Sequence, residues 1–237
     1  MFPIAHSELI QILRNRAVLI SSLIMPVAAS IFFIYYRDTF TGSPGYIGAL
    51  LVFTIAVFTL YATTVTTLAG RRQSLFLKRL RSTAASDSAI LSGLVLPVAA
   101  ISLVQIVLIL GVFATVGSPP DNTALLVAGI AAALAMMLAL GIATAGITNS
   151  PEHAQVTTLP LSLGIIAVAS WVGITGTESL GAVKRLLPGG AATEVVVNAW
   201  DGGTPLTDSL LLLAPTLGWV IVAIALASRL FRWEPRR

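Results

Sequence analysis

Six long stretches of this sequence contain no Asp, Glu, Lys, Arg or His. A helix needs roughly 20 consecutive apolar residues to cross a bilayer core that is about 30 Å thick. The stretches meet this requirement at about residues 17–36, 46–69, 89–117, 123–147, 156–176 and 209–228. Neither strand-like alternation nor a tandem repeat stands out. We therefore predict an all-α membrane protein in which residues 1–237 form a single domain with six transmembrane helices.

The low charge content agrees with this prediction. Of the 237 residues, 56% are hydrophobic and 10% are charged, whereas a soluble domain is about 25% charged. Too few polar side chains are present to cover a water-exposed globule, so the composition excludes an ordinary soluble enzyme. The sequence has no cysteine, and so no disulfide framework or thiolate metal site.

The distribution of Lys and Arg predicts the orientation. When the loops are assigned to alternate sides, one set holds 11 of the 14 basic residues, and the other holds only Arg37, Lys184 and Arg185. Basic residues are retained on the cytoplasmic side of a membrane. We therefore expect both termini in the cytoplasm, an even number of spans, and a positive charge that sets topology and does not bind nucleic acid.

The spans also lack the groups that drive chemistry or ion coupling. An ionisable residue inside a span marks proton relays and ion pathways, and none is present. Zinc-protease, serine-hydrolase and P-loop motifs are absent as well. We predict no catalytic, cofactor-binding or metal-binding residue on this chain, and we expect solvated side chains for the external carboxylates Glu178, Glu194, Asp201 and Asp208.

The segment before the first span has the pattern of an amphipathic helix. Leu9 and Leu13 share one face, and Arg14 and Arg16 follow them. This pattern is typical of a helix that lies in the headgroup plane of a membrane. The alternative is a plain extension of the first span.

A second cytoplasmic segment, residues 71–93, mixes apolar and basic side chains. Phe76, Leu77 and Leu80 stand among Arg72, Lys78, Arg79 and Arg81. The segment can present an apolar knob with a basic collar to a soluble partner. Alternatively, its charges set the topology only, or they lie on anionic lipid, where each contributes about 1 kcal/mol.

These segments, in their order along the chain, resemble a permease subunit of the ABC-2 type transporter superfamily. The resemblance rests on Leu13–Arg16 followed by Pro26, on Arg72–Thr83 with Gly93, and on the segment Leu186–Ala191 before the last span. The second of these resembles the family's loop R-E-x-G-x-x-x-x-L-R-x-T-P. Here Gln73 replaces the glutamate, and Ser74 or Leu75 stands where the glycine is expected.

The resemblance implies an exporter that moves a drug, an antibiotic or a lipid-like compound across a bacterial plasma membrane, and hence drug efflux or antibiotic resistance. It implies a second permease protomer, identical or related, and two copies of a separate ABC ATPase that binds ATP and Mg. It also implies a coupling helix between spans two and three that docks on the ATPase, with these residues as candidates: Arg72, Leu75, Phe76, Leu77, Arg79, Leu80 and Arg81.

The long segment between spans five and six contains apolar patches that a fully solvated loop would not need. We expect two short re-entrant helices that form an outer gate, with Leu187, Pro188 and Trp200 as candidates. A surface helix pair with Trp200 as an interfacial anchor is the alternative.

Span two offers a candidate substrate path in Phe58, Thr59, Tyr61 and Thr63. Hydroxyls among aromatic rings suit an amphipathic ligand, although threonines that bond to their own helix explain the same residues. In span three, we expect the amide of Gln105 to reach a neighbouring helix.

Two classes of function compete with transport. A membrane scaffold or immunity protein without a transport cycle would share the uncharged spans. A membrane enzyme acting on lipid is poorly supported, because no acid–base pair has a recognisable spacing.

Overall fold

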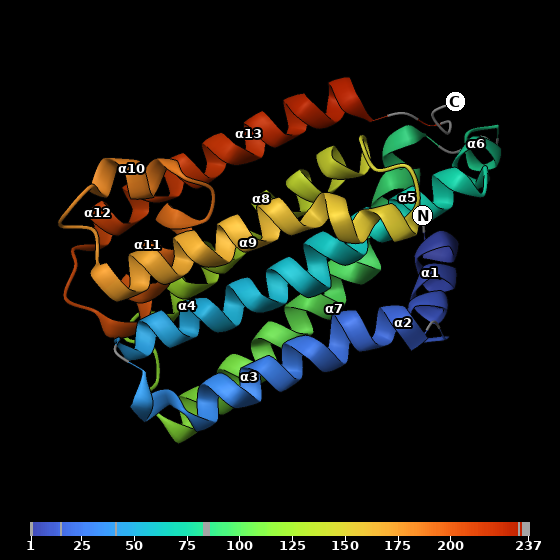
Figure 1. Cartoon of the computed structure of the whole chain (residues 1–237). Coiled ribbons are helices and arrows are strands. Elements are labelled where there is room, and N and C mark those ends of the chain that lie inside the picture. Colours follow the sequence, from blue (N-terminus) through green and yellow to red (C-terminus); the bar gives the residue numbers. More distant parts are fainter. Residues whose placement is uncertain (1, 15, 41, 83–85, 232, 234–237) are drawn as a thin grey trace.

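The computed structural model describes residues 2–14, 16–40, 42–82, 86–231 and 233, and every secondary-structure element in these ranges is a helix. Long helices run side by side in one bundle, and short helices cover its two ends (Figure 1). The helix α1 and the helix α6 lie at one end, and α10, α11 and α12 lie at the other (Figure 1). We call the first of these the basic end and the second, after the orientation that the sequence predicts, the outer end.

The first half of the described chain forms nine elements, of which η1 and η3 are π-helical and η2 is a 3-10 turn. They are α1 (Phe2–Arg14), α2 (Arg16–Leu19), η1 (Ile20–Ile24), α3 (Met25–Tyr35), η2 (Arg37–Thr39), α4 (Pro44–Ile55), η3 (Ala56–Ala62), α5 (Thr63–Gln73) and α6 (Phe76–Arg81). The second half forms α7 (Asp87–Val116), α8 (Thr123–Ala145), α9 (Pro151–Thr175), α10 (Gly181–Leu186), α11 (Gly190–Asp201), α12 (Leu206–Leu211) and α13 (Leu213–Leu230).

Five helices in the described ranges are long and apolar enough to cross a membrane. They are Pro44–Gln73, Asp87–Val116, Thr123–Ala145, Pro151–Thr175 and Leu206–Leu230, which correspond to the second to sixth predicted spans. The first predicted span, residues 17–36, contains the shorter apolar helix Ser22–Tyr35. The all-helical membrane fold is therefore confirmed with five candidate spans, and the sixth stays a prediction.

Helix boundaries follow local chemistry. Ser43, Ser86, Asn122 and Ser150 precede α4, α7, α8 and α9, and each side chain accepts a hydrogen bond from a backbone N–H in the first turn. Such caps satisfy N–H groups that lack partners within the helix. The residue at which each of these helices begins is therefore specified by its neighbours in the sequence.

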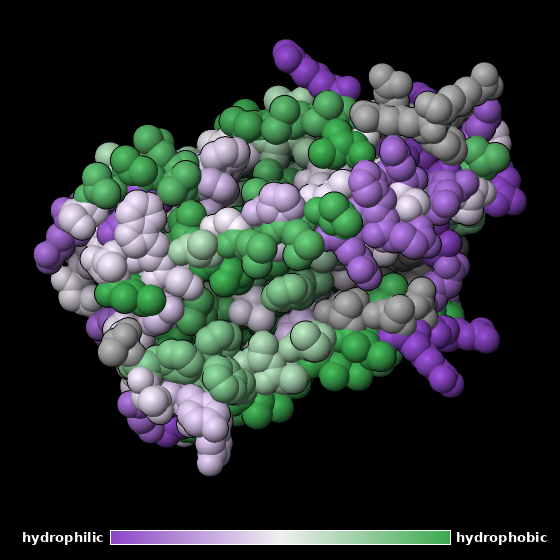
Figure 2. Space-filling model, in the orientation of Figure 1, coloured by the Kyte–Doolittle hydropathy of each residue, from purple (hydrophilic) through white to green (hydrophobic). Residues whose placement is uncertain are grey.

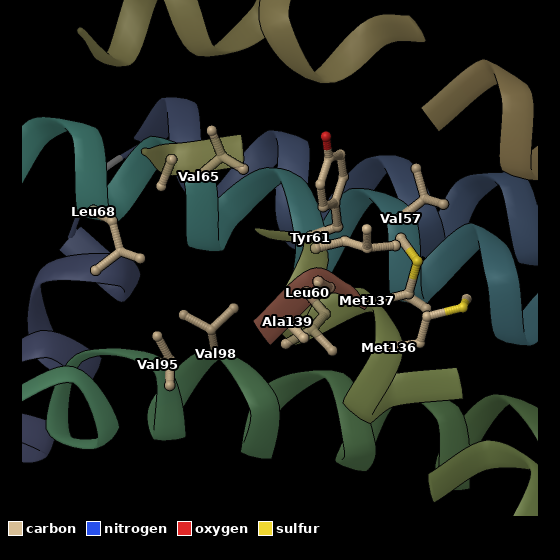
Figure 3. Packing of buried hydrophobic residues seen from close by; sticks show 14 of the residues in the cluster. Val57, Leu60, Tyr61, Val65, Leu68, Val95, Val98, Met136, Met137 and Ala139 are labelled. Atoms are coloured by element: carbon tan, nitrogen blue, oxygen red, sulfur yellow. The ribbon is translucent and has the colours of Figure 1, made fainter. Parts of the chain in front are cut away.

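The centre of the bundle is the helical run α4–η3–α5. Its buried residues contact α7 and α8, and Figure 3 shows Leu60 and Leu68 facing Val98 of α7 and Met136 of α8. Most of this run is covered on all sides by protein, whereas α7, α9 and α13 expose many apolar side chains. In Figure 2, apolar residues cover the middle of the visible face and hydrophilic residues gather over the α6 end. This distribution is the one expected of a bundle surrounded by lipid.

Gln105 corrects one expectation. Its side chain is buried on α7, but neither its amide nitrogen nor its amide oxygen has a hydrogen-bond partner in the described part of the chain. The next buried residues of α7, Ile106 and Leu110, pack in an apolar cluster with residues of α4, α8 and α11, so this side of α7 faces mainly apolar neighbours.

Candidate functional site

The α6 segment begins with an unusual turn. Leu75 precedes α6 with φ 57° and ψ 14°, in the left-handed region that glycine adopts freely and that costs other residues about 1–2 kcal/mol. This is one of the two positions at which we expected the glycine of the resembled loop. The structure thus explains that glycine, because the chain must turn sharply between α5 and α6.

The apolar residues of α6 do not form an exposed knob. Leu77 is fully buried, and Phe76 and Leu80 pack against the core of the bundle. Leu75 is 47% exposed, and Lys78 and Arg79 are exposed next to it. A short helix at the bundle surface turns its apolar side toward the protein, so the surface open to a partner is Leu75 with a basic collar.

Arg72 connects the end of α5 to the loop between α8 and α9 at the same end of the bundle. Its side chain is 1% exposed, and its guanidinium donates a hydrogen bond to the carbonyl oxygen of Thr148 in the loop between α8 and α9. Thr148 also shares a hydrogen bond of 2.9 Å with Thr157 of α9. Two hydrogen bonds, one of them buried and the other partly buried, therefore link α5 to α9 through the loop that follows α8.

Arg81 connects the other end of α6 to its neighbours. Its Nε lies 3.2 Å from Oδ1 of Asp87 at the start of α7, and its guanidinium lies 5.2 Å from the centroid of the Trp233 ring. Both members of the ion pair are about half exposed, so its stabilising effect is small. Arg81 thus contacts α7 and Trp233, whereas Arg79 donates to the carbonyl oxygen of Ser74 in the turn before α6.

The segment predicted as an interface helix forms the helix α1, which contacts α7 and α2, and its place in the headgroup plane stays a prediction. Leu9 is half-buried, and Arg14 and Arg16 are exposed. The side chain of Leu13 lies outside the described residues. Gln11 accepts a hydrogen bond from Arg71 of α5. The interface helix is therefore attached to the same helix that leads into α6.

The candidate path residues of span two lie in or next to the π-helical segment η3. Thr59, Tyr61 and Thr63 are buried, and Phe58 is 42% exposed. Thr59 donates a hydrogen bond of 2.5 Å to the carbonyl oxygen of Ser22 in η1, the second π-helical segment. Tyr61 bonds to Thr144 of α8.

Isolated π-helical turns are frequent at functional sites, and here two of them pack together. Two of the four candidate side chains, Thr59 and Tyr61, bond to other helices, whereas Thr63 donates to the carbonyl oxygen of Phe58 in its own helical run. Their role in a path stays a prediction.

An apolar cleft lies elsewhere, between α7, α8 and α13. It has a volume of about 580 Å³ and lies near the basic end, where Phe231 and Trp233 form part of its wall. Small residues on α8, including Ala135 and Ala139, leave its floor open. In the sequence, these alanines belong to a row of small residues spaced by three or four positions. Such a row is typical of a helix-packing face and gives no indication of a cleft.

The outer end is closed by α11. Most of its side chains are buried, and it packs against α4, α8 and α9. Leu187 and Pro188, two of the gate candidates, are half-buried in the turn before α11. Trp200 is 3% exposed, and its indole N–H donates to the carbonyl oxygen of Ser118 at 3.1 Å. Trp200 is thus buried at the outer end of the bundle.

A polar network holds α10 against α11. Arg185 donates two hydrogen bonds to the carboxylate of Glu194, at 2.7 and 2.6 Å, and Thr177 donates a third at 2.8 Å. Hydrogen bonding to Glu194 raises the pKa of Arg185 above its ordinary value. We call Thr177, Arg185 and Glu194 the outer latch.

The expectation of a solvated Glu194 is wrong, because its side chain is only 11% exposed. Its partner Arg185 lies nine residues earlier in the chain. The sequence does not give the shape of the segment between them, so no sequence pattern indicated this ion pair.

Lys184, next to the latch, is fully buried. Its ammonium donates to the hydroxyl of Thr175 at 2.8 Å and to the carbonyl oxygen of Gly176 at 2.7 Å, and it lies 5.1 Å from the centroid of the Trp171 ring. A cation at a helix C-terminus is favourable, and this one satisfies the end of α9. Sequence reasoning treated Lys184 as an ordinary loop charge.

The described residues contain no group of three or more His, Cys, Asp or Glu side chains that could hold a metal ion. The polar groups described above position helices at the two ends of the bundle. The arrangement joins helices and carries no catalytic group that these contacts reveal: Leu75 is exposed beside α6, Arg72 is bonded to Thr148, and a polar network holds α10 against α11.

The family model described as ABC-2 family transporter protein matches residues 11–229, which extend from α1 nearly to the end of α13. No curated protein and no solved structure matches the chain.

Proposed function

The chain belongs to the ABC-2 transporter family, and from this premise we propose that it is the permease subunit of an ATP-driven exporter of amphipathic or hydrophobic compounds. Members of this family are multi-pass membrane subunits that normally work with an ABC ATPase. In our proposal, ATP and Mg bind to two copies of that ATPase, and a second permease protomer, identical or related, completes the complex.

The observation that carries the proposal is the buried Arg72. It lies between the exposed turn at Leu75 and the loop that joins α8 to α9. A force applied to α6 by a partner therefore reaches three long helices without passing through solvent. Structural anchoring of α6 alone would not require a buried guanidinium at this point, because Leu77 already holds α6 to the core.

We also propose how the chain is oriented in the membrane. We place α1 and α6 in the cytoplasm of a bacterial cell, because the basic end carries most of the Lys and Arg residues. Residues 16–35 form one uninterrupted helical run, whose length at 1.5 Å per residue is about 30 Å. We propose that this run is the first of six spans, which returns both termini to the cytoplasm.

The proposed substrate class follows from the surfaces that the chain offers. The cleft between α7, α8 and α13 is largely apolar and lies next to the polar groups of Asp87 and Ser228. Ligand sites commonly combine an apolar wall with a few polar groups. This combination favours a compound with an apolar body and a polar head, such as a drug, an antibiotic or a lipid-like molecule.

The test is co-purification of the tagged chain with the ABC ATPase encoded nearest to it, followed by measurement of ATP hydrolysis in lipid nanodiscs. We expect recovery of the ATPase and hydrolysis with the parental chain. The double variant Leu75→Asp with Arg79→Glu should lose both, because it changes the exposed surface of α6 and leaves Leu77 in place. Arg229→Glu is the matched control, since Arg229 is exposed near the same end but lies on α13.

Two results would contradict the proposal in different ways. If the α6 variant and Arg229→Glu recover the ATPase equally well, α6 is not the docking element. If the parental chain recovers no ATPase and supports no hydrolysis in lipid, the scaffold or immunity function is the better interpretation.

A further inference from the structure

A second cleft, of about 620 Å³, lies at the basic end between the interface helix and α5. Ile10 and Arg14 of α1 and Val18 of α2 form one wall. Thr67 and Arg71 of α5 face them from the other wall. This volume is within the range of small-molecule sites.

The cleft is positively charged. Arg14 and Arg71 are both part of its lining, and no carboxylate is among the described residues that line it. The hydroxyls of Thr67 and Ser74 are also in the lining. Guanidinium and hydroxyl groups are the usual partners of a phosphate, and Arg binds phosphate through two parallel hydrogen bonds. The lining therefore favours an anion that carries a phosphate.

Arg71 is held in position at the cleft. Its guanidinium donates to the amide oxygen of Gln11 on α1 and lies 5.2 Å from the centroid of the Phe76 ring on α6. A guanidinium has five N–H donors in a fixed plane, so one arginine can hold several groups at once. Preorganisation of this kind lowers the entropic cost of binding.

The cleft lies at the level of the lipid headgroups along the membrane normal. The span Pro44–Gln73 has 30 residues and is about 45 Å long, which exceeds a hydrocarbon core of about 30 Å. Arg71 is close to its end and therefore falls in the headgroup region. Ile10 is 41% exposed and, together with Val18, gives the cleft an apolar wall beside its charges.

We propose that this cleft binds the headgroup of an anionic phospholipid from the inner leaflet, with its phosphate between Arg14 and Arg71 and an acyl chain against Ile10 and Val18. A soluble phosphate compound would use the two guanidinium groups but not the apolar wall. The bound lipid joins α1 to α5 next to the turn into α6. It thereby holds the interface helix against α5.

Native mass spectrometry of the purified, delipidated chain tests this inference without any partner. The chain is incubated with equal amounts of phosphatidylglycerol and phosphatidylcholine, and the retained lipids are counted. One basic contact with anionic lipid corresponds to about fivefold in affinity. We expect one phosphatidylglycerol per chain, and about a 30-fold weaker retention in the double variant Arg14→Gln with Arg71→Gln.

The control double variant Arg79→Gln with Arg229→Gln removes the same charge outside the cleft and should retain phosphatidylglycerol as the parental chain does. Thr67→Trp fills the cleft and keeps both arginines, so it should lose the lipid even if the charge variant misfolds. Gel filtration checks that each variant remains monodisperse.

Equal retention of the two lipids, or an equal loss in the control variant, would overturn the site. Displacement of phosphatidylglycerol by millimolar glycerol 3-phosphate would show a site for soluble phosphate and overturn the lipid assignment. Because the assay uses the isolated chain, its failure would leave the proposed transport function standing.

Discussion

Breaking the outer latch should measurably loosen the closed end of the bundle. The latch joins α10 to α11 through two hydrogen bonds from Arg185 to Glu194. The perturbation is a double-mutant cycle that consists of Glu194→Gln, Arg185→Gln and the two changes together. Such a cycle isolates the energy of the pair from the other effects of each substitution.

The expected coupling energy follows from the burial of the two groups. Exposed ion pairs contribute about 0–1 kcal/mol, whereas removal of one partner from a buried pair costs about 3–5 kcal/mol. The side chain of Glu194 is 11% exposed and that of Arg185 is 42% exposed, so solvent screens one partner only. The bidentate geometry adds strength, and we expect a coupling energy of about 2 kcal/mol.

The assay is equilibrium unfolding in mixed micelles of dodecyl maltoside and SDS, followed by tryptophan fluorescence. Trp200 is a suitable reporter because it is buried on α11, the helix that the latch holds. The chain supplies its own control in Arg37 and Asp38, whose charged atoms are 3.6 Å apart and whose carboxylate is 86% exposed. A cycle on that pair should give less than about 0.5 kcal/mol.

The reasoning fails if the two cycles give the same coupling energy within error. That result would mean that Glu194 is solvated in the membrane-embedded protein, as the sequence alone suggested. A large coupling at Arg185 and Glu194 with none at Arg37 and Asp38 would establish that burial makes the latch strong.

Three further substitutions test single features of the bundle. Leu75→Gly should raise the free energy of unfolding by about 0.5–1 kcal/mol, since it relieves a left-handed backbone at some cost in chain entropy; unchanged or lower stability in thermal unfolding would refute the strain. Gln105→Leu should also stabilise the protein, by about 1–3 kcal/mol, because it removes a buried amide without a described partner; destabilisation in SDS titration would reveal a partner. Gly173→Ala should destabilise the contact between α4 and α9 by about 1–3 kcal/mol, because its Cβ would overlap the ring of Tyr46. Gly164→Ala on the same helix meets nothing within 4 Å and should leave the melting temperature unchanged or raise it.

The membrane-spanning helices could be predicted from the sequence because their signal is local. In lipid, a backbone must satisfy its own hydrogen bonds, so an apolar stretch of sufficient length forms a helix in almost any context. Five predicted spans appear as long apolar helices for this reason. The caps at Ser43 and Asn122 are local signals as well, since each bonds within its own first turn.

Which side of α6 packs against the bundle could not be predicted in the same way. Lipid and protein interior are both apolar, so the positions of Phe76, Leu77 and Leu80 do not distinguish a surface for a partner from a surface for the bundle. Only the packed structure shows that these side chains point inward and that Leu75 remains outside.

The sequence by itself therefore determined five of the six predicted spans, the all-helical class, the basic segment at α6 and the family. The tertiary structure decided which charges are buried and what they hold. Arg72 bonds to Thr148 across 76 positions of the chain, and Glu194 becomes the centre of a latch only when α11 folds back between the long helices. Span formation depends on neighbouring residues along the chain, whereas the partner of a buried charge depends on how separate helices pack, and no local pattern records that.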